Sequence, residues 1–330
     1  MAKAFLIGTT MATAPVSAHA ASDTSQLEGQ VAQLKSLRAA DARVFNIFWR
    51  LSTKNVALCE GDDPATGMLL QARSSYDGDF AEAADRFFGF EGEVSVEALA
   101  PNGPADRAGV KQNDTLVAIN GKDLPVAQGP EAVAAAQRAL IAAGKDGTID
   151  LTVLRDHTRT RLQVSPLSAC PGRVEVTVSN QRGASTDGSV LQISSAMLNA
   201  LPGDGELASV IAHEYSHVIL HHPSRLTAAH VDRGLLASFG KNRRLIRRTE
   251  EEADRLSVYL LLNAGYDPMA PGRFWRTVGR NMDAGFLSDG THMGWRDRAE
   301  MVDQEAARAK ALDQRPAIPA LLATRDDPLE

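Results

Sequence analysis

The sequence has few cysteines, no long apolar run and no excess of positive charge. Two cysteines in 330 residues allow at most one intrachain disulfide. Beyond the N-terminus no segment approaches ~18 uninterrupted apolar residues, so we expect no transmembrane helix in the mature protein. The formal net charge of −6 argues against nucleic acid as the main partner. What is present, 44% hydrophobic and 23% charged residues, is typical of a globular protein with one large or two modest domains.

The N-terminus has the pattern of a signal peptide. Lys3 precedes a mildly apolar stretch over 4–16, which small residues follow over 17–21. Within that run, Ala18-His19-Ala20 fits the small-x-small rule for cleavage. We therefore predict a signal peptide over 1–21, cleavage near Ala20, and export. A disordered tail is the alternative interpretation. No cysteine stands at the cleavage site, which removes the simplest route to a lipid anchor.

Hydrophobic periodicity predicts an α+β chain. Apolar residues recur at helical spacing over 25–57, and a turn-rich, β-branched module follows over 92–164. We expect further strands over 173–179 and 189–194, and helices over 80–87, 130–143, 206–222, 249–263 and 271–282. The basic run over 241–248 reads as a mobile loop between two helices. The proline-rich C-terminus reads as loose.

The decisive motif is an H-E-x-x-H sequence within the predicted helix 206–222. A spacing of four residues places His213 and His217 on one helical face, where both rings can reach one ion. Glu214 can then reach a water on that ion and act as its general base. The alternative is a surface helix with two histidines. The strongly apolar flanks 210–212 and 218–220 disfavour it, because burying these polar residues without a partner is expensive.

A third zinc ligand is available in the acidic segment 249–254. A catalytic zinc site takes three protein ligands and keeps one open position. We predict Glu250 as this ligand, with Asp254 accepting a hydrogen bond from the far nitrogen of a zinc-bound histidine. Glu252 competes, but it lacks an acidic residue four positions on. The alternative is that these acidic residues only mark the beginning of a helix, because acidic side chains are favourable in the first turn.

The residues after the motif exclude one subclass of zinc peptidase. A metzincin would need glycine at position 220 and histidine at 223, where this chain has Leu220 and Pro223. His221 and His222 are nearby, but we expect them on the surface or behind the ligands.

These segments together resemble the family forty-eight zinc metallopeptidases, whose relatives include the CAAX prenyl protease, HtpX and soluble periplasmic members. The resemblance rests on 213–222, 250–254 and the Ala-Gly-Tyr-Asp-Pro segment 264–268, and it covers about 173–298. It implies a gluzincin-type fold, one Zn²⁺ per chain, endopeptidase activity on polypeptides and, for an exported chain, a periplasmic location.

The resemblance also assigns a substrate strand and a further histidine. The strand containing Ser189, Leu191 and Ile193 should pair with extended substrate, although an ordinary core strand is the alternative. Thr291-His292 and Arg298 resemble a T-H-P…R segment, with Met293 in place of the proline. His292 would approach the metal or stabilise the oxyanion; a structural histidine is the alternative.

The segment 89–166 resembles a PDZ domain, chiefly over 96–121. Phe88, Gly89 and Phe90 would form the loop that receives a peptide's C-terminal carboxylate; a degenerate spacer is the alternative. Cys59 and Cys170 flank this insertion, so a disulfide between them would clamp both of its ends. Two buried free thiols are the alternative.

The predicted organisation is a signal peptide (1–21), an N-terminal helical part (22–87), a PDZ-like domain (88–166), a peptidase domain (167–312) and a loose tail (313–330). The predicted function is zinc-dependent cleavage of unfolded or damaged envelope proteins, with the PDZ-like domain capturing substrate or regulating. A non-catalytic chaperone or peptide-binding scaffold is the main alternative, and a structural zinc protein is the third. Retention of Glu214 favours the enzyme, because a binder needs no general base.

Overall fold

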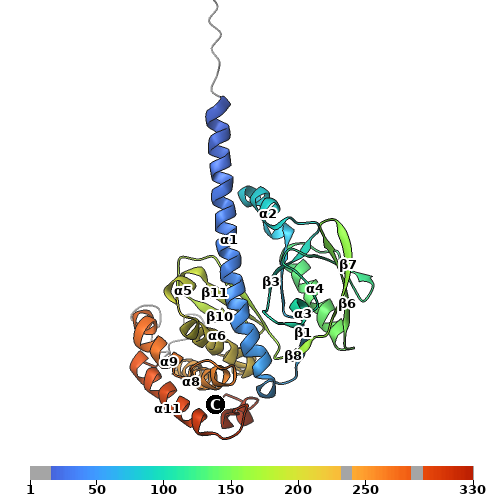
Figure 1. The fold of residues 1–330 in the computed structure, drawn as a ribbon. Helices are drawn as coiled ribbons and strands as arrows, with labels where there is room; N and C mark the ends of the chain where they lie inside the picture. Colours follow the sequence, from blue (N-terminus) through green and yellow to red (C-terminus); the bar gives the residue numbers. More distant parts are fainter. Residues whose placement is uncertain (1–15, 232–239, 284–292, 330) are drawn as a thin grey trace, which may run out of the picture.

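The protein consists of a helical body and a β-rich insertion. The long helix α1 (Val16–Lys54) runs alongside both (Figure 1). The computed structural model describes residues 16–231, 240–283 and 293–329. Most of the predicted signal peptide, 1–15, therefore lies outside the described residues, and the rest of it forms the first turns of α1. No helix in the described ranges combines the length and the apolarity needed to cross a bilayer.

The helical body contains a three-stranded sheet in the order β10-β11-β9. The central strand pairs antiparallel with β10 and parallel with β9. Buried residues of α1, the sheet and the helices form one core, which includes Leu51, Leu191 and Ile211. The elements are β9 (Arg173–Thr177), β10 (Ala184–Thr186), β11 (Val190–Ser194), α5 (Ser195–Ala200), α6 (Asp204–Ile219), α7 (His222–Ala228), α8 (Gly240–Asn263), α9 (Ala270–Phe274), the π-helical turn η4 (Trp275–Gly279), α10 (Arg280–Asp283), α11 (Trp295–Ala311) and η5 (Ala320–Thr324).

The insertion is an antiparallel sheet in the order β2-β3-β4-β6-β7, with β5 paired to β4 and a separate core of its own. Its first strand begins at Met68, before the predicted domain start at 88, because β2 pairs with β3 across an intervening helix. Strands β6 and β7 pair antiparallel as a hairpin. The elements are β2 (Met68–Ala72), η2 (Arg73–Ser75), η3 (Gly78–Phe80), α2 (Ala81–Phe88), β3 (Val94–Leu99), α3 (Pro104–Arg107), β4 (Thr115–Ile119), β5 (Lys122–Asp123), α4 (Gly129–Gly144), β6 (Ile149–Arg155) and β7 (Thr158–Val164).

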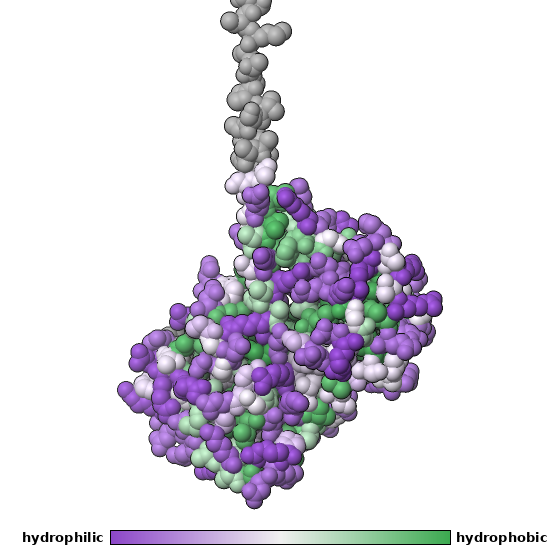
Figure 2. Space-filling model, in the orientation of Figure 1, coloured by the Kyte–Doolittle hydropathy of each residue, from purple (hydrophilic) through white to green (hydrophobic). Residues whose placement is uncertain are grey.

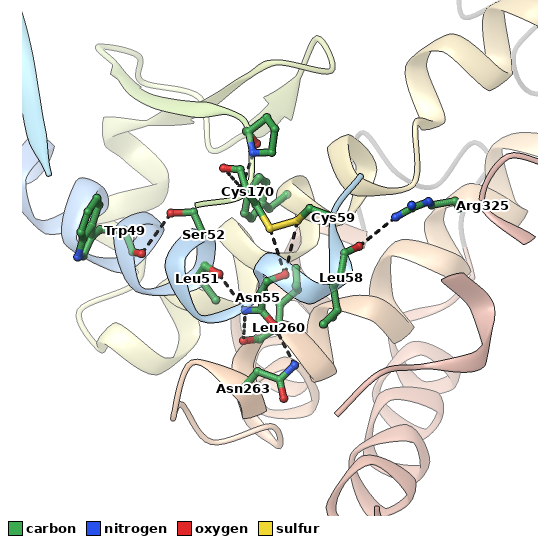
Figure 3. The surroundings of a disulfide bond; sticks show 12 residues. Trp49, Leu51, Ser52, Asn55, Leu58, Cys59, Cys170, Leu260, Asn263 and Arg325 are labelled. Carbon is green, nitrogen blue, oxygen red and sulfur yellow. Dashed lines mark hydrogen bonds between the residues drawn. A yellow bond between two sulfur atoms is a disulfide. The ribbon is translucent and has the colours of Figure 1, made fainter. Parts of the chain in front are cut away.

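A narrow neck joins the insertion to the body. The two chain crossings pair as β1 (Asp63–Ala65) and β8 (Leu167–Ala169), and the predicted disulfide between Cys59 and Cys170 closes the neck beside them. Beside the disulfide, the buried Asn55 donates from Nδ2 to the carbonyl oxygens of Leu51 and Leu260, at 2.9 and 3.0 Å (Figure 3). The short helix η1 (Val56–Leu58) lies between Asn55 and Cys59 in the chain. The neck is thus anchored to the core of the body.

A second contact holds the insertion along α1. Phe88 is 2% exposed and packs with Leu34 of α1, in a cluster that also contains Leu27 and Val31. Hydrophobic residues gather on the surface where the outer part of α1 meets α2 (Figure 2). The Arg38 guanidinium lies 4.5 Å from the Phe88 ring centroid. Helix α1 therefore packs against both parts of the molecule.

Two expectations for irregular segments are wrong. The basic run 241–248 is helical and belongs to α8, where ion pairs one turn apart, Arg247–Glu251 and Arg248–Glu252, support the helix. The C-terminal segment over 313–329 is packed: the Ala317 N–H donates to the Asn263 side chain at 2.7 Å, and Ala317 is fully buried. Arg325 also donates to the Leu58 carbonyl oxygen at 3.1 Å (Figure 3). Specific polar contacts outweigh the irregular sequence there.

Candidate metal centre

Three predicted ligands from two packed helices converge in the helical body. His213 and His217 lie on α6, and Glu250 lies on α8. The His213 Nε2 is 3.2 Å from the His217 Nε2 and 3.3 Å from the Glu250 Oε2. The Glu250 Oε1 is 3.5 Å from the His217 Nε2. Apolar residues such as Ile211 and Leu256 are fully buried around them, which holds both helices in place.

The spacing of these atoms fits a tetrahedral zinc ion. With bonds of about 2.0–2.1 Å, neighbouring ligand atoms of a tetrahedral site lie about 3.3–3.4 Å apart. The histidine nitrogens are 3.2 Å apart, and the Glu250 oxygen nearer to each lies 3.3 Å from His213 and 3.5 Å from His217. Two imidazoles and one carboxylate are also ligand types that zinc prefers. The three residues thus have the chemistry and the spacing to hold a zinc ion and leave one coordination position free.

Asp254 and Arg298 support the first histidine. The His213 Nδ1 is 3.0 Å from the Asp254 Oδ1, as predicted for Asp254. The Arg298 guanidinium donates to both Asp254 oxygens, at 2.6 and 2.8 Å, and reaches the Glu250 Oε2 at 3.5 Å. It also lies 3.8 Å from the Trp275 ring centroid. From the sequence, Arg298 is identified only through the family resemblance, because nothing local shows that α11 returns to α8.

The protonation of the centre follows from burial and from these carboxylates. Burial disfavours the charged form of His213, but Asp254 and Glu250 outweigh it and raise its pKa to about 10. Burial lowers the pKa of His217 to about 3. His213 therefore holds the proton when no ion is bound, and because a ligating imidazole must be neutral, metal binding releases that proton.

Glu214 follows the first ligand on α6 and lines the same cavity. Burial raises the pKa of Glu214 to about 7, with the nearby His213 opposing and Glu250 adding to this shift. A carboxyl with such a pKa is suited to accept a proton near neutral pH. The cavity has a volume of about 1110 Å³ and is lined by the two histidines, Glu214, Glu250 and part of β10. It is large enough for several substrate residues.

The predicted substrate strand is β11, and the structure corrects its position. Strand β11 is central, with β9 and β10 on its two sides, and both Leu191 and Ile193 are fully buried, while Ser189 precedes the strand. Among the described residues, the outer strand of this sheet beside the cavity is β10. Strand β10 is not predictable from the sequence, because Ala184-Ser185-Thr186 lacks the alternation of apolar and polar residues that indicates a strand. The prediction of a strand over 189–194 is confirmed, but the prediction that this strand lies at the edge of its sheet is wrong.

The predicted carboxylate loop, Phe88 to Phe90, packs against α1. Gly89 ends α2 in the left-handed conformation, and its N–H donates to the Asp85 carbonyl oxygen at 3.0 Å. Phe88 and Phe90 have ring centroids 5.2 Å apart within the cluster on α1. These residues dock the insertion onto α1, because their rings find an apolar surface there.

The remaining candidate histidines and acids have separate positions. His292 lies in 284–292, outside the described residues. His221 is partly exposed, and its Nδ1 is 3.0 Å from the Asp326 Oδ1. His222 is fully buried behind His217, and Glu252 contacts it. Glu252 therefore does not take the position of the third ligand.

Comparison with known families agrees with the geometry. Residues 179–242 match the profile described as peptidase family M48, and residues 95–155 match a PDZ domain. No curated protein matches the chain significantly. The M48 match contains His213, Glu214 and His217 and ends before Glu250, whose carboxylate the structure brings beside the two histidines. These two matches support an M48 family metallopeptidase with a PDZ domain.

Proposed function

We propose that the protein is a zinc-dependent endopeptidase with its metal on His213, His217 and Glu250. The observation that carries this proposal is the convergence of two histidine nitrogens, 3.2 Å apart, with the Glu250 carboxylate, whose two oxygens lie 3.3 and 3.5 Å from them, next to the half-buried carboxyl of Glu214. When bound, zinc supplies Lewis-acid polarisation of a carbonyl and lowers the pKa of water. A structural zinc site would not need the open position that three ligands leave.

Glu214 is the general base in this proposal. It takes a proton from the attacking water and then delivers it to the nitrogen of the leaving segment. In the metal-free protein burial raises the pKa of Glu214 to about 7, and a carboxyl in that range can both accept and release a proton near neutral pH. Asp254 and Arg298 hold the ring of His213 in place while this happens.

The proposed substrate is an extended polypeptide segment beside β10. Residues 182–186 line the cavity that also contains the histidines, and β10 is the outer strand of its sheet in the described part of the chain. Main-chain hydrogen bonds to such a strand can hold a substrate in an extended conformation, and they depend little on its side chains. Unfolded proteins meet this requirement, because their backbone groups are free to pair.

We further propose that the PDZ domain captures or regulates substrate and that the enzyme works outside the cytosol. The clamp between Cys59 and Cys170, together with α1, supports a fixed coupling between the PDZ domain and the peptidase body. A structural disulfide persists in oxidising compartments, and the signal-like N-terminus is consistent with the envelope.

Cleavage of unfolded casein tests the proposal. Glu214→Gln should lower kcat by about 10²–10⁴-fold while the zinc content stays unchanged. Chelation should abolish cleavage, and added zinc should restore it. Glu251→Gln is the matched control, because Glu251 lies on α8 but pairs with Arg247 away from the centre. If wild type and Glu214→Gln both bind zinc and are equally inactive, the result favours a non-catalytic peptide-binding scaffold.

A further inference from the structure

The second zinc-binding histidine contacts another buried histidine. The His217 Nε2 faces His213 and Glu250, while its Nδ1 lies 2.8 Å from the Nδ1 of His222. The Nε2 of His222 lies 3.1 Å from the Glu252 Oε2. His222 is fully buried, with 0% of its surface accessible to solvent.

The chain path explains how His222 reaches this position. Helix α6 ends at Ile219, and His221 adopts the left-handed conformation with φ 54° before α7 begins at His222. This bend turns the chain back, so His222 faces the ring that lies five residues earlier. A straight continuation of α6 would direct residue 222 elsewhere, since five residues correspond to about 500° of helical rotation, some 140° away from His217.

The hydrogen-bond chemistry assigns a direction to this chain of contacts. A histidine that binds metal through Nε2 carries its proton on Nδ1, so His217 donates to the Nδ1 of His222. His222 then carries its own proton on Nε2 and donates to Glu252. Glu252 is held in turn by the Nη1 of Arg225 at 3.0 Å and the Nε of Arg248 at 2.9 Å. Every contact in this chain thus has one donor and one acceptor.

We propose that His222 is a positioning residue that fixes the tautomer and ring orientation of His217, and that Glu252 anchors it. The inference rests on the proposed metal centre. Each zinc-binding histidine then has its own support: His213 has Asp254 and Arg298, and His217 has His222 and Glu252. Groups behind metal ligands typically change metal affinity 10–100-fold when they are removed.

Three substitutions at His222 separate its two contacts. Asparagine places an amide oxygen near the position of the imidazole Nδ1, so His222→Asn keeps the acceptor for His217 and loses the donor to Glu252. Glutamine reaches the position of Nε2, so His222→Gln keeps the donor and loses the acceptor. His222→Leu loses both. His221→Gln is the matched control, because His221 is adjacent but contacts Asp326 and Glu60.

The readouts are the zinc dissociation constant, from competition with a chromophoric chelator, and the d–d absorption of the Co²⁺-loaded protein. We expect His222→Gln and His222→Leu to weaken zinc binding about 10–100-fold and to alter the Co²⁺ spectrum. His222→Asn should stay within about 3-fold of wild type with an unaltered spectrum. The His221→Gln control should match wild type.

Several results would overturn the inference. Unchanged affinity and spectra in the Gln and Leu variants would show that the histidine contact does not orient the ligand. An Asn variant as weak as the Leu variant, with all three equally destabilised towards urea in chelator, would indicate a packing role instead. Failure of the wild type itself to bind one zinc ion would reject the metal centre, which is a separate outcome from the other two.

Discussion

Removing the Arg298 guanidinium should destabilise the peptidase body far more than removing an exposed arginine. The Arg298 side chain is 3% exposed and that of Asp254 is 4% exposed, and two hydrogen bonds join them at 2.6 and 2.8 Å. Arg298→Met would leave a buried carboxylate without this partner, which typically costs about 3–5 kcal/mol. We expect about 3 kcal/mol in metal-free protein, because His213 still pairs with Asp254 there.

Arg276→Met is the matched control for this prediction. Arg276 lies on the neighbouring η4 and pairs with Asp303, but its side chain is 47% exposed, so the same substitution should cost below about 1 kcal/mol. The assay is urea unfolding followed by tryptophan fluorescence. All three tryptophans, Trp49, Trp275 and Trp295, lie outside the PDZ domain, so the signal reports on the peptidase body.

A double variant tests the physical reason for the loss. Asp254→Asn removes the charge that Arg298 balances, so combining it with Arg298→Met should cost clearly less than the sum of the two single losses. If Arg298→Met is no more costly than Arg276→Met, or if the two losses at 254 and 298 simply add, then balancing this carboxylate is not the role of Arg298.

Two further predictions concern the links between the PDZ domain and the body. The disulfide spans 111 residues of sequence, so the chain-entropy relation gives a stabilisation of about 4.8 kcal/mol; Cys59→Ala/Cys170→Ala should lose a large part of it in urea unfolding, and unchanged midpoints would contradict this. Asp41 on α1 is surrounded by Glu97 of β3, Glu175 of β9 and the Val176 N–H, and burial raises its pKa from 3.8 to about 6. Because the folded state takes up a proton that the unfolded chain does not yet hold, this group contributes stability as pH falls from about 6 to about 4, at most about 3 kcal/mol. Asp41→Asn should remove this gain, and parallel stability–pH curves for the two proteins would refute it.

Much of the metal centre could be predicted because its geometry is local. The four-residue spacing of His213 and His217 fixes their common face on any α-helix, and the spacing from Glu250 to Asp254 works in the same way on α8. The helix α4 and the hairpin of β6 and β7 were also predictable, since local periodicity and turn residues determine them.

Contacts between distant segments could not be predicted in this way. The edge position of β10, the packing of Phe88 on α1 and the approach of Arg298 to Asp254 depend on which surfaces meet, and nothing within a short window shows this. Likewise, the bend that brings His222 behind His217 requires the left-handed conformation at His221, and no local pattern in the sequence predicts that conformation.

The sequence by itself therefore determined which residues can bind a metal ion and take a proton, because helical spacing and side-chain chemistry are properties of short segments. Only the tertiary structure decided which groups stand behind those ligands and which strand borders the cavity. Those choices arise from long-range packing, where a buried charge or ring takes the partner that the folded core places beside it.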